Sequence, residues 1–566
     1  MTSKCSNLAN IEGDNRPPYH LTYTEVKLLG IAGAHLFNVH HMLLNDTLRC
    51  IAYDLFVINP VATMLQYRLY GGHALPRGPS GLYEGRGKHR KCYWTISVRC
   101  VMYFEESVTT TSGPGYLADA LGRKAIYGKE LMLIIGATIL CLTTPTGTLS
   151  PDSCLIYLGV FRIILGIGVG GDYPMSASIT SDRAAIRKRG TMLAYIFSNQ
   201  RWGSLVGSLV TIVVLAAYKH VMNDEGKTSK VDGVWRIVVG VSLIPAFGTL
   251  YQRLTLPESD RFKESQGQGQ EVNDIQLQHD DNWAAEVAAE KSGQHDAYVV
   301  EVVHKEAHFQ GSVLRSSASD TLVISDSEFL HYFSEWRHMK LLIGTCMCWF
   351  LLDIAFYGIN LNQNVVLEQI GFDGKTGTPW EKLFKVSTGN IIITALGFVP
   401  GYWATVLLIE KLGRKWIQIQ GFLLAALFLA ILAGTFTSLS KPAFIVCFSL
   451  LQFFFNFGAN TTTYCYPAEV FPTRFKGFAH GLSGAAGKAG AIISALAFNS
   501  LSESIGTAKV LWSVLRGMLY RRRRLYASSA GGSWARSGSG LGLGDGGGGT
   551  VKGFPPVVLI LCFTVI

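Results

Sequence analysis

Charged residues are scarce in this sequence, and motifs for catalysis or metal binding are missing from it. Asp, Glu, Lys and Arg make up 16% of its 566 residues, whereas soluble proteins contain about a quarter. The 11 cysteines form no CxxC pair and no spacing typical of metal ligands. No hydrolytic or nucleotide-binding signature occurs between the apolar segments. These absences argue against a soluble enzyme, and we expect no catalytic residue, no metal and no cofactor.

Apolar segments of bilayer-spanning length recur instead. A transmembrane helix needs about 20 mostly apolar residues. Ranges near or above this length are 131–148, 153–180, 191–218, 234–256, 341–360, 386–409, 416–436, 442–464 and 480–502. The net charge of +10 is distributed over the segments between spans, so we expect a lipid bilayer and no nucleic acid as partner. The sequence therefore predicts an all-α, multi-pass membrane protein.

The charged and polar segments predict how the chain is organised. Basic clusters at 123–124, 183–189, 411–415 and 474–476 fall in loops that the positive-inside bias places in the cytoplasm. Residues 1–25 are polar and contain no cleavable signal sequence. The predicted parts are a cytosolic N-terminus (1–25), a first helix bundle (26–257), a polar cytoplasmic linker (258–338), a second helix bundle (339–515) and a C-terminal tail (516–566).

One motif occurs in both halves. Residues 115–124 have the sequence GYLADALGRK, and residues 401–415 have the sequence GYWATVLLIEKLGRK, which indicates duplicated six-helix halves. The first copy resembles the loop between helices 2 and 3 of the major facilitator superfamily. The alternative is a solvated loop that joins two helices. The resemblance implies a conformational role for Gly115, Asp119, Gly122, Arg123, Lys124, Glu410, Gly413 and Arg414, and for Glu469 with Arg474 as a cytoplasmic clamp.

Three further segments carry a narrower resemblance. Residues 166–178 (GIGVGGDYPMSAS), 257–261 (PESDR) and 467–488 (PAEVFPTRFKGFAHGLSGAAGK) resemble the phosphate:proton symporters of fungi and plants. Glycines let helices approach closely, and Asp172 puts an ionisable group at membrane depth, where such groups are usually functional. The resemblance implies the major facilitator fold, with two six-helix bundles on a twelve-span plan.

The seventh span offers a candidate substrate site. Trp349, Asp353 and Tyr357 recur every four residues and so lie on one helix face. The resemblance assigns phosphate contacts to these three and to Tyr173, Gln200 and Asn460, with Lys488 as a nearby cation. Tyr, Gln, Asn and Trp N–H groups suit the donors and acceptors of phosphate. Asp353 would be protonated when the anion binds and could then donate a hydrogen bond.

Proton coupling and intramembrane charge are also assigned by the resemblance. The proton-coupling candidates are Asp54, Asp172 and Asp353, and Arg162 is an intramembrane cation for which simple helix pairing is the alternative role. Ile51 occupies the position of a second family aspartate of the first helix. Arg201 stands where the family has glycine, because the sequence here is NQRWG instead of NQGWG.

The sequence departs from the family pattern in two tracts. Residues 66–114 replace the expected second helix with polar, non-family sequence, and residues 516–566 form a basic, glycine-rich tail. The final apolar run, 554–566, is too short to span a bilayer unaided. Helices 1–2 and 12 are therefore predicted to be disrupted. A retained intron or a shifted reading frame would explain both tracts, and we expect them to impair transport.

Together these patterns predict proton-coupled uptake of inorganic phosphate across the plasma membrane by alternating access, with phosphate and protons as partners. A sugar or glycerophosphodiester porter of the same superfamily is one alternative. Such porters share the GRK loops and the PES-type motif. This alternative does not, however, predict the GGDYP segment together with Trp349, Asp353 and Tyr357. A transporter-like receptor that senses phosphate is the alternative from another class.

Overall fold

The computed structural model describes most of the two predicted bundles. Described residues are 108–265 and 326–511, with short gaps at 227, 264, 361–362, 373, 375–376, 437 and 507–508, together with residues 25, 53 and most of 60–69. Predictions for Ile51, Asp54, the rest of the N-terminus, most of 66–107 and the tail from 512 onward lie outside the described residues. Every regular element of the described part is helical, so the all-α prediction is confirmed there.

Helices of the first half run from α6 to α12, and those of the second half from α15 to α23. The first half contains α6 (Val108–Leu121), α7 (Arg123–Ile126), α8 (Lys129–Leu142), α9 (Pro151–Arg183), α10 (Arg189–Ala217), α11 (Val231–Gly240) and α12 (Leu243–Leu254). The second half contains α15 (Asp326–Ser334), α16 (Trp336–Asn360), α17 (Gln363–Ile370), α18 (Pro379–Ile393), η4 (Thr394–Phe398), α19 (Val399–Leu412), α20 (Arg414–Gly434), α21 (Lys441–Phe455), η5 (Asn456–Asn460), α22 (Thr461–Val470) and α23 (Lys476–Ile505).

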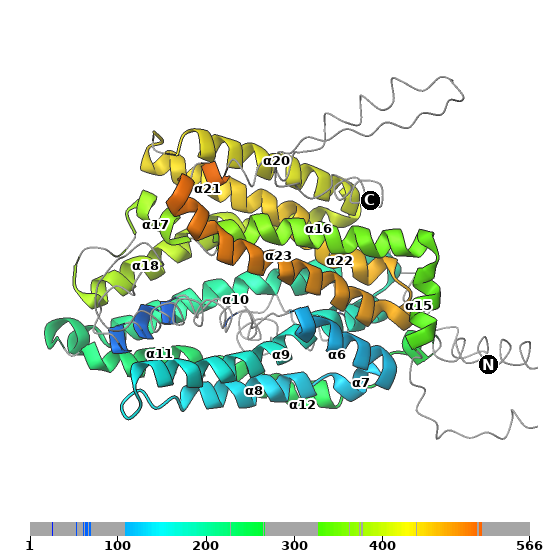
Figure 1. Ribbon diagram of the computed structural model, residues 1–566, viewed down its shortest axis with the longest axis horizontal. Helices are drawn as coiled ribbons and strands as arrows, with labels where there is room; N and C mark the ends of the chain where they lie inside the picture. The colour runs from blue at the N-terminus through cyan, green and yellow to red at the C-terminus, as the bar shows by residue number, and fades with distance from the viewer. Residues whose placement is uncertain are drawn as a thin grey trace, which may run out of the picture.

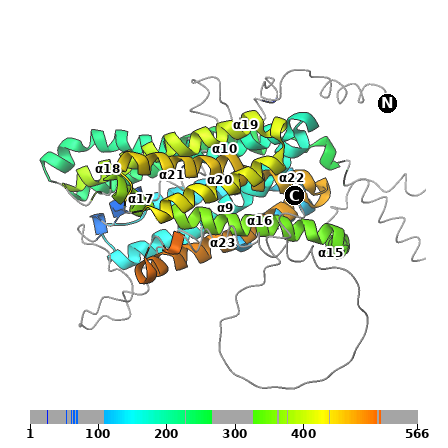
Figure 2. The same cartoon turned by 90° about the horizontal axis from the view of Figure 1, so that it is seen from above.

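The long helices run roughly along the longest axis of the molecule (Figure 1). Helices α20 and α21 lie on one side, α8 and α12 lie on the other, and α9 and α10 lie between them. Seen from above, α10 and α19 follow one edge and α16 and α23 follow the opposite edge (Figure 2). The two halves therefore meet along α10 with α18 and α19, and along α6 with α23.

Local sequence explains where several helices begin and end. Helix α18 starts with a capping box in which the Thr378 hydroxyl accepts from the Glu381 N–H and Pro379 occupies the first turn. Gly122 (φ 91°) and Gly413 (φ 78°) separate α6 from α7 and α19 from α20. Both belong to the repeated GRK motif, and positive φ at these sharp turns favours glycine.

Eight helices of the described part are long and apolar enough to cross a membrane. They overlap the eight predicted spans from 131–148 to 442–464, although the first helix ends at Leu142. The remaining predicted span, 480–502, lies within the 30 residues of α23. Helix α6 begins at Val108 and so extends into the predicted insert 66–114, although its 14 residues are too few to span a bilayer alone.

Candidate functional site

A buried hydrogen-bond network links both halves of the molecule near its centre. Gln200 Nε2 on α10 donates to Tyr173 Oη on α9 over 2.9 Å, and its Oε1 accepts from Tyr402 Oη on α19 over 3.4 Å. Asn460 Nδ2 donates to Tyr402 Oη and to Asn456 Oδ1, each over 2.9 Å. All five side chains are at most 6% exposed. The network therefore connects α9 and α10 with α19 and η5 through amides and hydroxyls.

The predicted face of α16 lies beside α23. Lys488 Nζ on α23 lies 3.0 Å from Tyr357 Oη and 5.4 Å from the centre of the Tyr173 ring. Trp349 packs so closely on Gly487 that a Cβ at this glycine would lie 2.2 Å from the indole Cδ1. Asp353 is 3% exposed and lies one helical turn from both Trp349 and Tyr357. Lys488 thus joins the α16 face to the network that contains Tyr173.

Arg201 belongs to the same region. Its guanidinium carbon lies 4.0 Å from the centre of the Phe398 ring and 4.8 Å from that of Phe356, and Tyr402 is its hydrogen-bond partner. These contacts and those above define a set of side chains that we call the central cluster. Its members are Tyr173, Gln200, Arg201, Trp349, Asp353, Tyr357, Tyr402, Asn460 and Lys488.

The structure brings together most of the residues predicted to contact phosphate and adds one that sequence reasoning missed. Tyr402 bridges Gln200 and Asn460. It belongs to the repeated motif, to which only a conformational role was assigned. The available signal was a tyrosine inside an apolar span, and tyrosine hydroxyls at such depth usually find a polar partner. Arg162, on the same helix as Tyr173, is 3% exposed and lies about 16 Å from it along the axis.

Asp172 belongs to a separate buried ion cluster. Its carboxylate pairs with Arg253 on α12, and Arg253 Nη1 also lies 3.4 Å from Glu130 Oε1 on α8. The guanidinium carbon lies 4.3 Å from the centre of the Tyr127 ring. Arg253 and Glu130 were absent from the predicted site, although each is a charge inside or beside an apolar range. Asp172 and Tyr173, adjacent in sequence, therefore contribute to different clusters.

Charged residues gather at the end of the molecule formed by the GRK motifs, which we call the basic end. Asp119 lies 3.6 Å from Arg123, and its Oδ2 accepts from the Phe478 N–H of α23 over 2.8 Å. Arg123 also pairs with Asp182, whose Oδ1 lies 2.8 Å from Lys476 Nζ. The first-half motif therefore contacts the start of α23 in the second half.

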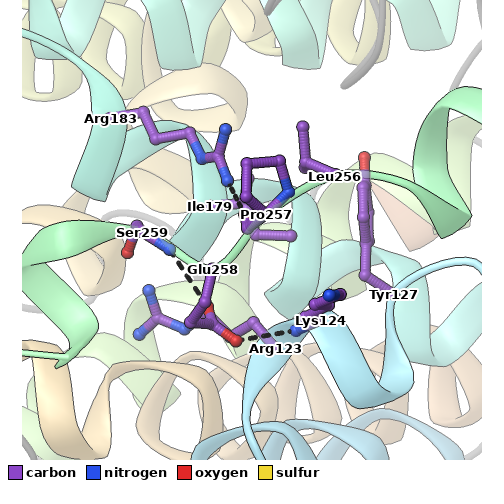
Figure 3. Close-up of a pocket in the computed structure, with 9 residues that line it drawn as sticks. All are labelled: Arg123, Lys124, Tyr127, Ile179, Arg183, Leu256, Pro257, Glu258 and Ser259. Carbon is purple, nitrogen blue, oxygen red and sulfur yellow. Dashed lines mark hydrogen bonds between the residues drawn. The ribbon is translucent and has the colours of Figure 1, made fainter.

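The segment that carries the PES motif covers part of the basic end. Arg123, Lys124, Tyr127 and Arg183 line a small pocket with Glu258 and its neighbours (Figure 3). Glu258 Oε2 accepts from the Lys124 N–H over 2.9 Å, and Arg183 donates to the Pro257 carbonyl. The PES segment thereby joins the GRK turn to the end of α9.

The second motif makes a similar set of contacts, but the predicted clamp has a different partner. Arg414 lies 2.6 Å from Glu410 and 2.7 Å from Glu469, and Glu410 Oε1 accepts from the Thr191 N–H of α10 over 3.0 Å. Arg474 lies 2.5 Å from Glu328 on α15. Glu469 therefore pairs with Arg414 and not with Arg474. Helix α22 ends at Val470 and Phe471 has extended backbone angles, so Glu469 and Arg474 do not lie on one continuous helix.

This arrangement of long apolar helices, two linked halves and a buried polar centre defines a polytopic membrane transporter of the major facilitator superfamily. A family model described as Sugar (and other) transporter matches residues 49–519. The structure also matches the proton:xylose symporter XylE of E. coli with a TM-score of 0.58 at 17% identity, covering 88% of this chain and 94% of that chain. The predicted fold class is confirmed, and the chain is a transporter and not an enzyme.

Curated relatives narrow the family. The inorganic phosphate transporter PHO84 of Saccharomyces cerevisiae is 34% identical over 85% of this chain and 76% of its own length. Inorganic phosphate transporter 1-2 of Oryza sativa subsp. japonica is 35% identical over 68% of this chain and 70% of its own length. The chain belongs to the Sugar (and other) transporter family and, within it, to the inorganic phosphate transporters of fungi and plants. The resemblance found in the sequence is thus confirmed.

Proposed function

We propose that this protein takes up inorganic phosphate together with protons across the plasma membrane by alternating access. The observation that carries the proposal is the central cluster, in which amides, hydroxyls and two cations from both halves converge in a buried position. Phosphate presents oxygen acceptors and hydroxyl donors, and Gln, Asn, Tyr and Lys side chains satisfy both. The names of the relatives at 34–35% identity support phosphate over a sugar as the substrate.

Asp353 is the proposed link between phosphate and protons. An ionised carboxylate would repel a bound anion, whereas a protonated carboxyl group can donate a hydrogen bond to it. Binding of phosphate therefore goes together with a proton on Asp353, and loss of this proton expels phosphate. Asp172 and Asp54 are further proposed proton carriers. Asp172 lies in the Arg253 cluster, next to Tyr173 in sequence, and Asp54 lies outside the described residues.

Contacts between the two halves occur on both sides of the central cluster, and this arrangement supports alternating access. At the basic end, the Ser181 hydroxyl donates to the Ala468 carbonyl over 2.6 Å, and Lys476 pairs with Asp182. At the opposite end, Trp380 Nε1 donates to the Leu215 carbonyl over 2.6 Å. We propose that either set opens in turn around the fixed central site.

Uptake of labelled phosphate in cells that lack their own phosphate transporters tests this function. We expect uptake that a proton gradient drives and that Asp353→Asn abolishes. Asp260→Asn is the matched control, because the Asp260 side chain is 94% exposed. Full gradient-driven uptake by Asp353→Asn would contradict the proposed coupling. Uptake of a labelled sugar instead of phosphate would favour the sugar porter.

Two further results separate the remaining possibilities. A phosphate-dependent signal that persists in Asp353→Asn without uptake would favour a receptor. A repaired chain carries family sequence in place of residues 66–114 and 516–566. Phosphate uptake by the repaired chain, without uptake by the unmodified chain, would show that these two tracts impair transport as predicted. Surface labelling of intact cells tests the plasma-membrane location.

A further inference from the structure

Arg201 carries a buried positive charge from the first half of the chain into the second. It follows Gln200 on α10 and is 3% exposed. Its guanidinium lies over Phe398 of η4 and Phe356 of α16, both of which belong to the second half. Arginine at this depth departs from the glycine of the family pattern. A buried cation is costly unless its surroundings or a ligand stabilise it.

Arg201 and Lys488 reach the central cluster from different helices. Arg201 contacts its hydrogen-bond partner Tyr402 and the ring of Phe356, the residue that precedes Tyr357 on α16. Lys488 Nζ lies 3.0 Å from Tyr357 Oη and over the ring of Tyr173. The two cations therefore lie against neighbouring residues of α16, Arg201 against Phe356 and Lys488 against Tyr357, in the proposed phosphate site.

The charges of the central cluster fit a doubly charged ligand. Asp353 is the carboxyl group of this cluster, and the proposed function requires it to be neutral while phosphate is bound. Lys488 then balances one negative charge, and Arg201 balances a second. Attraction between charges grows with the product of the charges and is strong where water is excluded. A guanidinium also offers a planar pair of donors that matches two oxygens of a tetrahedral oxyanion.

We propose that Arg201 makes the central cluster selective for tetrahedral dianions. The chain then binds hydrogen phosphate, HPO₄²⁻, in preference to dihydrogen phosphate, H₂PO₄⁻, and sulfate competes with phosphate for the same site. This inference rests on the proposed function, because it places phosphate in the central cluster. The competing explanation is that Arg201 only fastens the two halves together through its contacts with Phe356 and Phe398.

Competition for labelled phosphate uptake distinguishes these explanations. Sulfate serves as a permanent tetrahedral dianion and hypophosphite, H₂PO₂⁻, as a permanent monoanion. We expect sulfate to inhibit the unmodified chain more strongly than hypophosphite. Arg201→Gln removes the charge and keeps a polar side chain, and it should raise the inhibition constant of sulfate at least about tenfold relative to that of hypophosphite, as loss of one charge-assisted hydrogen bond implies. Arg201→Lys should retain most of the preference.

Each outcome of the competition assay supports or overturns the proposed role of Arg201. Arg337→Gln is the matched control because Arg337 is exposed at the start of α16, and it should leave the ratio of the two inhibition constants unchanged. An unmodified chain that takes up phosphate but is not inhibited by sulfate overturns the proposal without any variant. An unchanged ratio in Arg201→Gln overturns it as well. If Arg201→Gln is present at normal abundance in the membrane but takes up no phosphate, binding of labelled sulfate to the purified protein replaces uptake as the measurement. Sulfate affinity equal to that of the unmodified protein then overturns the proposal in favour of a purely structural role of Arg201.

Failure of the proposed function gives a different result. If neither the unmodified chain nor the chain in which family sequence replaces residues 66–114 and 516–566 takes up phosphate, the proposed function fails. If only the repaired chain takes up phosphate, the proposed function stands, and the sulfate competition is measured in the repaired chain. Phosphate uptake that Asp353→Asn blocks but that sulfate does not inhibit gives the third outcome. The proposed function then stands, and only the proposed role of Arg201 fails.

Discussion

Removal of Arg253 should destabilise the protein far more than removal of an exposed arginine. Arg253 is fully buried and pairs with Asp172 and Glu130, which are also buried. Arg253→Met leaves these carboxylates without their cation, and breaking a buried ion pair by removing one partner costs about 3–5 kcal/mol. Arg337→Met is the control because Arg337 is exposed at the start of α16. Its loss should cost about 0.5 kcal/mol or less.

Thermal unfolding of the purified protein in detergent measures this difference. Arg253→Met should lower the unfolding temperature several times more than Arg337→Met. Adding Asp172→Asn to Arg253→Met removes one of the stranded charges and should restore part of the stability, giving a coupling energy of about 1 kcal/mol or more in a double-mutant cycle. Equal effects of the two arginine variants, or a double variant whose losses simply add, would refute the assignment of this cluster as a buried ion network.

Two more substitutions test other parts of the structure. Tyr402→Phe removes the hydroxyl that bridges Gln200 and Asn460 and should raise the KM for phosphate uptake about tenfold through loss of hydrogen bonding, whereas Tyr251→Phe, at a residue that is 76% exposed, should not. Gly458→Ala places a Cβ 2.5 Å from Gly421 Cα and should destabilise the protein by about 1–3 kcal/mol. Gly136→Ala meets nothing within 4 Å and should be neutral, so equal unfolding temperatures of these two glycine variants would contradict the close contact of α20 with η5.

The sequence predicted best what depends on spacing along one helix. The span ranges and the shared face of Trp349, Asp353 and Tyr357 follow from apolar length and a near-integral number of turns. The placement of Tyr173 with Gln200 followed from the family resemblance and not from spacing. Sequence could indicate which residues were unusual at membrane depth. It could not indicate which of them meet.

The failures concern contacts between distant segments. Arg253 and Glu130 are separated by 123 positions. The sequence around either residue does not predict that the two form a pair. Arg474 was expected to pair with nearby Glu469, but the chain leaves helix α22 between the two residues and Arg474 pairs with Glu328. Glu328 belongs to α15, within a segment predicted only as a polar linker. Tyr402 joined the site because packing of α19 on α10 points its hydroxyl at Gln200.

The contacts that close the two ends differ in kind, and this difference bears on the transport cycle. The basic end is held by buried charges, including Lys476 with Asp182, which are separated by 294 positions. At the opposite end, Trp380 donates to the Leu215 carbonyl and Thr378 donates to Asn223, and Lys219 Nζ lies 5.5 Å from the centre of the Trp380 ring. Charges that separate into water regain their hydration, which offsets much of the attraction lost, and dissolved salt screens the exposed charges. Salt should therefore favour opening of the basic end more than opening of the opposite end.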